Sequence, residues 1–141
     1  MSLRKIVLVV FILLFLIGCD TAQSAKVNIL QVTRPAGKYP AFSKTVHDAN
    51  SVQRFYNLAY SLPSPPAGKV NCPADNGVVY NLTFLDGSTL VQTMVLQASG
   101  CERLLITNNS QNMRMPNQAF QEAFLKLIGL PSLIPYPSPG T

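Results

Sequence analysis

The chain has 141 residues and a formal net charge of +5, from 11 lysine and arginine residues and 6 acidic ones. This length is enough for one domain with a substantial apolar core. Beyond Arg4 and Lys5 the basic residues stand singly, a distribution that favours a solvated surface and argues against a nucleic-acid partner.

The N-terminal segment has the composition of an export signal. Arg4 and Lys5 precede an unbroken apolar run from Ile6 to Ile17. This run is shorter than the roughly 20 residues that a membrane-spanning helix needs. A basic segment followed by a short apolar run is typical of a secretory signal peptide. We therefore expect an exported protein, in a compartment where disulfide bonds persist.

The sequence Leu16-Ile17-Gly18-Cys19 resembles the lipobox of bacterial lipoproteins. In that family the chain is cut just before the cysteine, whose thiol receives a diacylglyceryl group with acyl chains such as palmitate. The resemblance implies that residues 1–18 are a signal peptide, that Cys19 is lipidated and that residues 19–25 are a tether. Two acyl chains would anchor the protein stably on the extracytoplasmic face of a cell membrane. Asp20 resembles the inner-membrane retention signal of double-membrane bacteria, and the choice between inner and outer membrane stays open.

The next segment predicts a strand and then a helix. Residues 26–33 are rich in β-branched and apolar side chains and end at turn-forming residues, so we expect a strand over 26–33 and a loop over 35–44. Asp48 is a suitable N-cap for a helix that runs to Ser61. Apolar residues at helical spacing give this helix one face for packing on a sheet: Val52, Phe55, Ala59 and Leu62.

The stretch from Cys72 to Cys101 predicts a β-hairpin. Apolar and polar residues alternate from Val78 to Phe84, and Asp86-Gly87 is a strong hairpin signal. With Asp86-Gly87 as a two-residue type I′ loop, the register pairs Leu82 with Val91 and Val78 with Val95. A slip by one residue would instead turn Leu90, Met94 and Leu96 towards the core. Because this second set is also apolar, the sequence leaves both registers open.

The chain has 3 cysteines. Cys72 precedes the first hairpin strand and Cys101 follows the second, and these ends of an antiparallel pair are neighbours. The topology and the export signal therefore favour a Cys72–Cys101 disulfide over two free thiols. With Cys19 assigned to the lipid, no thiol is left for catalysis or for a metal site.

After Cys101 we expect a third strand over 102–107, a polar loop over 108–112 and a second helix. Pro116 suits the first turn of that helix, and Gly129 suits its end. The proline-rich residues 131–141 predict a disordered tail. The prediction is one α+β domain over residues 26–130, with a four-stranded, mainly antiparallel sheet in the order strand, helix, three-strand meander, helix. Both helices should cover one face.

No motif assembles a catalytic set. His47 stands beside Asp48, but Asp48 is better used as a helix cap, so we interpret His47 as a surface residue. The acids of the mature chain are isolated in sequence: Asp20, Asp48, Asp75, Asp86, Glu102 and Glu122. We therefore expect no cofactor, no metal and no enzymatic activity. The leading hypothesis is a non-enzymatic binding module for an extracytoplasmic protein or wall component, and an alternative is an enzyme whose carboxylates meet only in the fold.

A helix, Cys72-Pro73, a strand, an Asp-Gly hairpin and a second cysteine resemble, in order, the subtilisin-inhibitor-like proteins. The resemblance covers about 30 residues, and this chain lacks the family's second disulfide. It implies that the loop Ala74-Asp75-Asn76-Gly77 is presented to a serine protease, with Ala74 at the scissile position. Asn76-Gly77 predicts a flexible loop, whereas an inhibitor gains affinity from a preorganised one.

Overall fold

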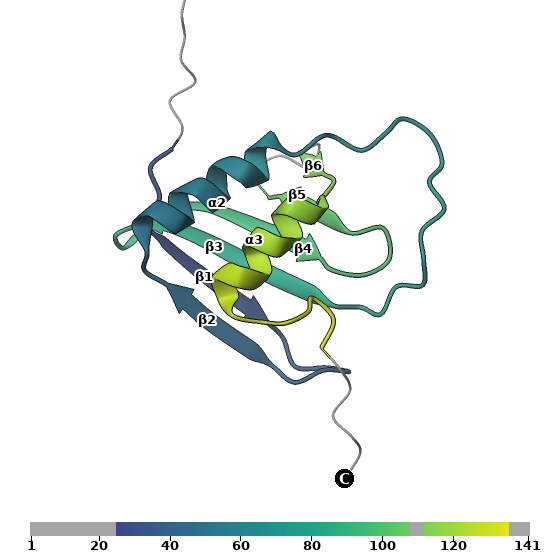
Figure 1. Cartoon of the computed structure of the whole chain (residues 1–141), viewed down its shortest axis with the longest axis horizontal. Helices are drawn as coiled ribbons and strands as arrows, with labels where there is room; N and C mark the ends of the chain where they lie inside the picture. Colours follow the sequence, from purple (N-terminus) through teal and green to yellow (C-terminus); the bar gives the residue numbers. More distant parts are fainter. Residues whose placement is uncertain (1–24, 108–111, 136–141) are drawn as a thin grey trace, which may run out of the picture.

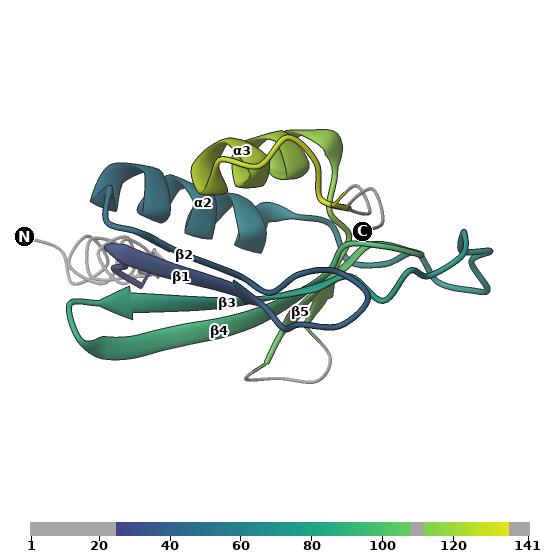
Figure 2. The ribbon, with the colours of Figure 1, turned by 90° about the horizontal axis from the view of Figure 1, so that it is seen from below.

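Within the residues that the structure describes, six antiparallel strands form one sheet, and two helices lie side by side on one of its faces (Figure 1 and Figure 2). The structure is a computed structural model that describes residues 25–107 and 112–135. The strand order in the sheet is β2-β1-β3-β4-β5-β6. In chain order the elements are β1 (Ile29–Arg34), β2 (Phe42–Val46), α2 (Ala49–Ser61), β3 (Val79–Asp86), β4 (Thr89–Gln97), β5 (Arg103–Ile106), β6 (Met113–Arg114) and α3 (Gln118–Ile128).

The predicted α+β class and the placement of both helices on one face are confirmed. The strand count is wrong, because the sheet has six strands where four were expected. Strand β2 begins inside the segment 35–44 that was interpreted as loop, and β6 is only 2 residues long. Both are edge strands held by backbone pairing with one neighbour, so they lack the apolar alternation that marks a buried strand.

The helix ends follow from capping residues. Helix α2 has the predicted N-cap, since the carboxylate of Asp48 accepts hydrogen bonds from the backbone N–H groups of Asn50 and Ser51. Helix α3 ends as predicted at Gly129, which has a φ of +74° and donates its N–H to the carbonyl of Leu125. Its start differs from the prediction: Asn117 is the N-cap, so Pro116 lies before the helix and not in its first turn.

The hairpin between β3 and β4 turns one residue later than predicted. Asp86 pairs with Thr89, which leaves Gly87 and Ser88 as the loop. Gly87 has a φ of +61° and no non-glycine described residue has a positive φ, which matches a type II′ turn and rules out the predicted type I′ turn. Asp86 stays in the strand, where its carboxylate accepts a hydrogen bond from Asn28 at 2.8 Å.

A bulge between Phe84 and Leu85 then shifts the register, so that Leu82 pairs with Met94 and Tyr80 with Leu96. The pairing of Leu82 with Val91 is therefore wrong. The slipped register correctly placed Met94 and Leu96 in the core, but it also placed Leu90 there, which is 59% exposed.

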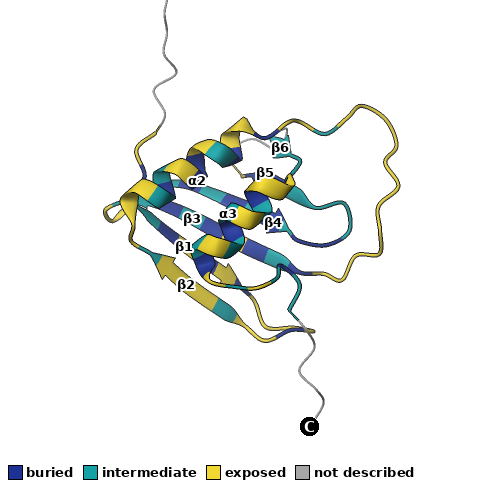
Figure 3. Ribbon diagram, viewed as in Figure 1, coloured by how far each residue is buried: buried dark blue, intermediate teal, exposed yellow. Residues whose placement is uncertain are grey.

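The buried residues lie where the helices and the sheet face each other (Figure 3). Many of their side chains are aromatic. Phe55 of α2 stacks on Phe120 of α3 at 4.9 Å, and Phe124 meets Tyr80 of β3 edge-on at 5.4 Å, between ring centroids. The hydroxyl of Tyr80 donates a hydrogen bond to the carbonyl of Leu133 at 2.8 Å, and Leu133 is only 7% exposed. The packed chain therefore continues beyond residue 130, where the domain was expected to end.

Arg34, at the end of β1, is a buried cation with 8% exposure. Its guanidinium donates to the Tyr80 hydroxyl at 2.7 Å and twice to the carbonyl of Pro40. It also lies over the rings of Phe42 and Tyr80, which stabilise a cation through their π-electrons. These contacts fix the β1–β2 turn against the core without a carboxylate partner among the described residues.

Within residues 25–107 and 112–135, neither helix has the length and apolar character that crossing a membrane requires. The expected signal peptide, Cys19, most of the tether and residues 136–141 lie outside the described residues.

Candidate functional site

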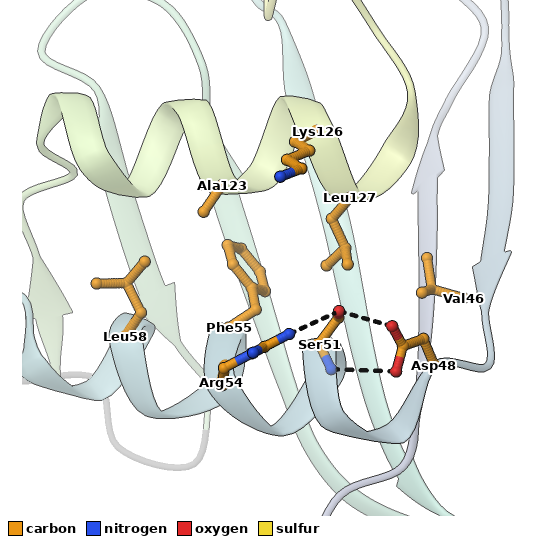
Figure 4. A pocket seen from close by; sticks show the side chains of 9 residues that line it. All are labelled: Val46, Asp48, Ser51, Arg54, Phe55, Leu58, Ala123, Lys126 and Leu127. Carbon is orange, nitrogen blue, oxygen red and sulfur yellow. Dashed lines mark hydrogen bonds between the residues drawn. The ribbon is translucent and has the colours of Figure 1, made fainter.

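An open groove runs between α2 and α3 (Figure 4), with a volume of about 470 Å³. Its floor and walls are mostly apolar, and three charged side chains stand along it. The ring of Phe55 is buried in the core below, whereas Leu58, Ala123, Leu127 and Val46 are only partly buried. The lining residues are Val46, Asp48, Ser51, Arg54, Phe55, Leu58, Ala123, Lys126 and Leu127.

The sequence forms this groove through helical spacing. Ser51, Phe55 and Leu58 lie on one face of α2 because they are three or four residues apart, and Ala123 and Leu127 do the same on α3. Ala123 contributes only a methyl group opposite the larger side chains of α2. A small residue at this position keeps the space between the helices open.

The single acid in the groove, Asp48, forms its hydrogen bonds with residues of α2. Asp48 accepts from the Ser51 hydroxyl at 2.8 Å, and Arg54 donates to the same hydroxyl at 3.3 Å. The Ser51 hydroxyl is the main cause that holds the pKa of Asp48 below its ordinary value, with backbone bonds adding to it. The carboxylate therefore stays charged at the N-terminus of α2, where the helix dipole favours an anion.

Lys126 lines the groove from α3, and its side chain lies against that helix with the ammonium at the edge of the groove (Figure 4). Glu122 lies one turn earlier and would be its natural helical partner, but that carboxylate accepts a hydrogen bond from Gln118 at 2.8 Å. Among the described residues the ion pair is Lys26–Asp86, at 3.8 Å. The ammonium of Lys126 thus has no carboxylate partner in the described part of the chain.

A second candidate site is the loop that follows Cys72. The predicted disulfide between Cys72 and Cys101 is confirmed, with 4.7 Å between the two Cα atoms. Residues 71–77 are all exposed, and the connector that leads from α2 to them is exposed over most of its length (Figure 3). The bridge fixes the start of this exposed loop against the end of the hairpin.

The hydroxyl of Ser99 holds the far side of the same loop. It accepts from the backbone N–H groups of Asn76 at 3.2 Å and Val78 at 3.3 Å, and it donates to the carboxylate of Asp75. Asp75 also accepts from the N–H of Gly77 at 2.8 Å. The loop is therefore hydrogen-bonded to the body of the protein, where the Asn-Gly pair alone predicted a flexible segment.

We expect Asp75 to hold the loop only while it is charged. The hydrogen bond from Ser99, and then that from Gly77, lowers its pKa below the ordinary 3.8. A carboxyl with a lowered folded-state pKa stabilises the fold above the unfolded-state pKa, and this stabilisation is lost as the pH falls through the folded-state pKa. In an NMR acid titration, the Gly77 amide should shift with a midpoint below 3.8. The variant Asp75→Asn should lack this step, and a midpoint at or above the ordinary pKa would contradict the assignment.

The other acidic residues and His47 do not come together in one site. The carboxylates of Asp86, Glu102 and Glu122 bond to Asn28, Gln121 and Gln118 respectively, so the described acids do not converge. Burial raises the pKa of Glu102, although Gln121 donates to it. His47 is exposed. No group of three or more histidine, cysteine or acidic residues is placed to hold a metal ion within the described ranges, and Asp20 lies outside them.

Sequence reasoning identified the bridged loop but missed the groove and the role of Ser99. The sequence does contain a signal for part of the loop network, because Asp75-Asn76-Gly77 is typical of a turn in which an aspartate accepts from the backbone two residues on. Nothing in the sequence alone shows that Lys126 and Arg54 flank one space. No protein-family model, curated protein or solved structure matches this chain.

Proposed function

We propose that this chain is a lipid-anchored, non-enzymatic binding module on the extracytoplasmic face of a bacterial membrane. The lipobox-like sequence Leu16-Ile17-Gly18-Cys19 supports the anchor. The partner is an extracytoplasmic protein or a wall component, and it binds in the groove between α2 and α3.

The groove is the observation that carries this proposal. Its volume of about 470 Å³ falls in the range of about 300–1,000 Å³ that is usual for ligand sites, and such sites combine apolar walls with a few polar groups. Here Leu58, Ala123 and Leu127 provide apolar walls, and the charged groups are one acid, Asp48, and two cations, Arg54 and Lys126.

The short segment between Cys19 and the described chain supports a position of the groove near the proposed anchor. Gln53 of α2 donates to the carbonyl of Ala25 at 3.2 Å and accepts from the N–H of Val27 at 2.9 Å. The six residues from Cys19 to Ser24 would span at most about 20 Å when fully extended. Helix α2, and with it one wall of the groove, would therefore remain close to the membrane surface.

The anchor is tested by replacing the lipid-bearing thiol. In the variant Cys19→Ser, we expect loss of radiolabelled palmitate and release of the protein from the membrane fraction, because the thiol that carries the acyl chains is gone and no lipid anchor is left. The domain should fold as before, since Cys72 and Cys101 keep their bridge. Label and membrane retention that persist in this variant would refute the anchor.

The groove is tested by photo-crosslinking in cells that produce the full chain. A photoreactive amino acid at Leu58, inside the groove, should give a discrete adduct, whereas the same group at Asn57 should not, because Asn57 is an exposed neighbour outside the lining. The variant Ala123→Trp should abolish the Leu58 adduct by filling the space. Equal adducts at both positions, or an adduct that survives Ala123→Trp, would contradict binding in the groove.

A specific observation favours a second candidate, a protease inhibitor that presents Ala74 to Gly77. The Cys72–Cys101 bridge and the Ser99 hydroxyl fix both sides of an exposed loop, and this preorganisation lowers the entropy cost of binding. The full chain should then inhibit subtilisin stoichiometrically and Ala74→Asp should not. Equal behaviour of the two proteins would exclude this function.

A further inference from the structure

We propose that Asn76 is a site of spontaneous covalent modification, where asparagine is converted to aspartate or isoaspartate, and that Asp75 and Ser99 restrain this reaction in the folded protein. The inference goes beyond the proposed function, because it concerns the exposed loop after Cys72 and not the groove or the anchor. Among the asparagines of the whole sequence, only Asn76 is followed by glycine.

The reaction joins two neighbouring residues of the chain. The backbone nitrogen of Gly77 attacks the side-chain carbon Cγ of Asn76, and the new N–Cγ bond closes a succinimide ring. The bond from Cγ to Nδ2 breaks, and ammonia leaves with the proton of the Gly77 N–H. Water then opens the ring at either carbonyl, which gives aspartate or isoaspartate. Water is the only other reactant, so the surroundings of these two residues decide the rate.

The structure leaves the reacting groups accessible. Asn76 and Gly77 are both exposed, and a Cβ atom added to Gly77 would meet no atom within 4 Å. A side chain after the asparagine would crowd the approach of the nitrogen to Cγ, and glycine has none. No described residue holds the side-chain amide of Asn76 by a hydrogen bond. Only the backbone of this pair is held in place.

The turn itself offers a simpler explanation for part of this sequence. Gly77 has a φ of +72°, which glycine adopts without steric cost, and Asp75 accepts from the backbone two residues on. These requirements explain the residues at 75 and 77. They do not require asparagine at 76, because no non-glycine described residue has a positive φ. The reactive pair is therefore not dictated by the turn.

The hydrogen bonds of the loop oppose the reaction. The Gly77 N–H donates to the carboxylate of Asp75 at 2.8 Å, and a charged acceptor holds that proton more strongly than a neutral one. The nitrogen must give up this bond and its proton to form the ring. The Ser99 hydroxyl donates to the same carboxylate and accepts from the Asn76 N–H at 3.2 Å. The reaction should therefore be slower in the folded protein than in the unfolded chain.

The modification would change the loop once it occurs. It places a new carboxylate next to that of Asp75, and isoaspartate also adds a methylene group to the main chain at position 76. Like charges at this distance repel each other, and a lengthened main chain no longer fits the bonds to Ser99. The modified loop should therefore lose its attachment to the body of the protein.

The test is to incubate the purified full chain at neutral pH and to measure the conversion of each asparagine by peptide mapping and mass spectrometry. Asn71 is the internal control, because it is exposed in the same segment but precedes Cys72. The folded wild type should convert Asn76 and not Asn71, and more slowly than the chain unfolded in guanidinium chloride. The variant Asp75→Ala should convert Asn76 about three- to tenfold faster than the folded wild type, as expected for the release of one hydrogen bond.

The variant Glu122→Ala, which removes an acid outside the loop, should convert Asn76 at the wild-type rate. If Asn76 converts no faster than Asn71 even in the unfolded chain, the modification site is wrong. Equal rates in folded wild type and Asp75→Ala would overturn the restraint. If circular dichroism shows that Asp75→Ala has lost its fold, the variant Asp75→Asn decides, because it keeps a neutral oxygen in place of the carboxylate. A rate above that of the wild type then supports the restraint, and an unchanged rate overturns it.

Discussion

Replacing Phe124 with alanine is expected to lower the free energy of unfolding by about 3–5 kcal/mol, the usual cost of deleting a buried aromatic ring. Phe124 has 0% exposure, and its ring lies 5.7 Å from that of Phe55 and 5.4 Å from that of Tyr80, between centroids. It therefore joins α3 to both α2 and the sheet. The loss would combine the transfer of the ring to water with the cavity left among these neighbours, and urea denaturation measures it.

Leu90→Ala is the matched control, because Leu90 is an apolar residue with 59% exposure. Its replacement should change stability by less than about 0.5 kcal/mol. A Phe124→Ala variant that is as stable as Leu90→Ala would mean that α3 does not pack on the sheet as described.

The elements that sequence predicted well are those with one buried face. Along β3, the buried residues Tyr80, Leu82 and Phe84 alternate with more exposed ones. Along α2, the buried residues Val52, Phe55, Tyr56 and Ala59 follow the helical period. Burial on one side imposes a period on the sequence, and the length of that period distinguishes a strand from a helix.

The sequence did not predict strand β2 or the register of the β3–β4 hairpin, because both depend on interactions that impose no periodic pattern of apolar residues on the sequence. Strand β2 is mostly exposed and exists because its backbone pairs with β1. The register of the β3–β4 hairpin depends on Asn28, which accepts from the N–H of Gly87 and donates to the carboxylate of Asp86, both at 2.8 Å. Asn28 lies 58 residues from Asp86 in sequence, so a local pattern at Asp86-Gly87 could not show that the turn would move by one residue.

Of the two candidate sites, the sequence predicted the bridged loop but not the groove. The ends of one hairpin bring Cys72 and Cys101 together, and the expected topology together with the export signal predicted that bridge. The groove arises where Leu58 of α2 faces Ala123 of α3, which requires the packing of two helices that are distant in sequence. The cations of the groove could not be recognised as part of a site from the sequence, because Arg54 and Lys126 are isolated basic residues.

The double variant Cys72→Ser/Cys101→Ser is expected to lose about 3–4 kcal/mol of unfolding free energy. The bridge joins residues separated by 29 positions, and the chain-entropy model assigns that magnitude to a loop of this size in the unfolded state. A domain with about 5–15 kcal/mol of stability would remain folded at 25 °C. Urea unfolding of oxidised wild type against the double variant measures the difference, and Cys19→Ser serves as a control that keeps the bridge.

The same variant separates a structural role of the bridge from a functional one. Ser99 still bonds to Asn76 and Val78 without the bridge, so the far side of the loop stays attached while the side at Cys72 is released. If the loop inhibits subtilisin, inhibition should fall in the double variant while circular dichroism shows that the domain remains folded, because the released loop must be ordered again on binding. Undiminished inhibition would show that Ser99 alone preorganises the loop. Unchanged stability would show that the bridge constrains little of the unfolded chain.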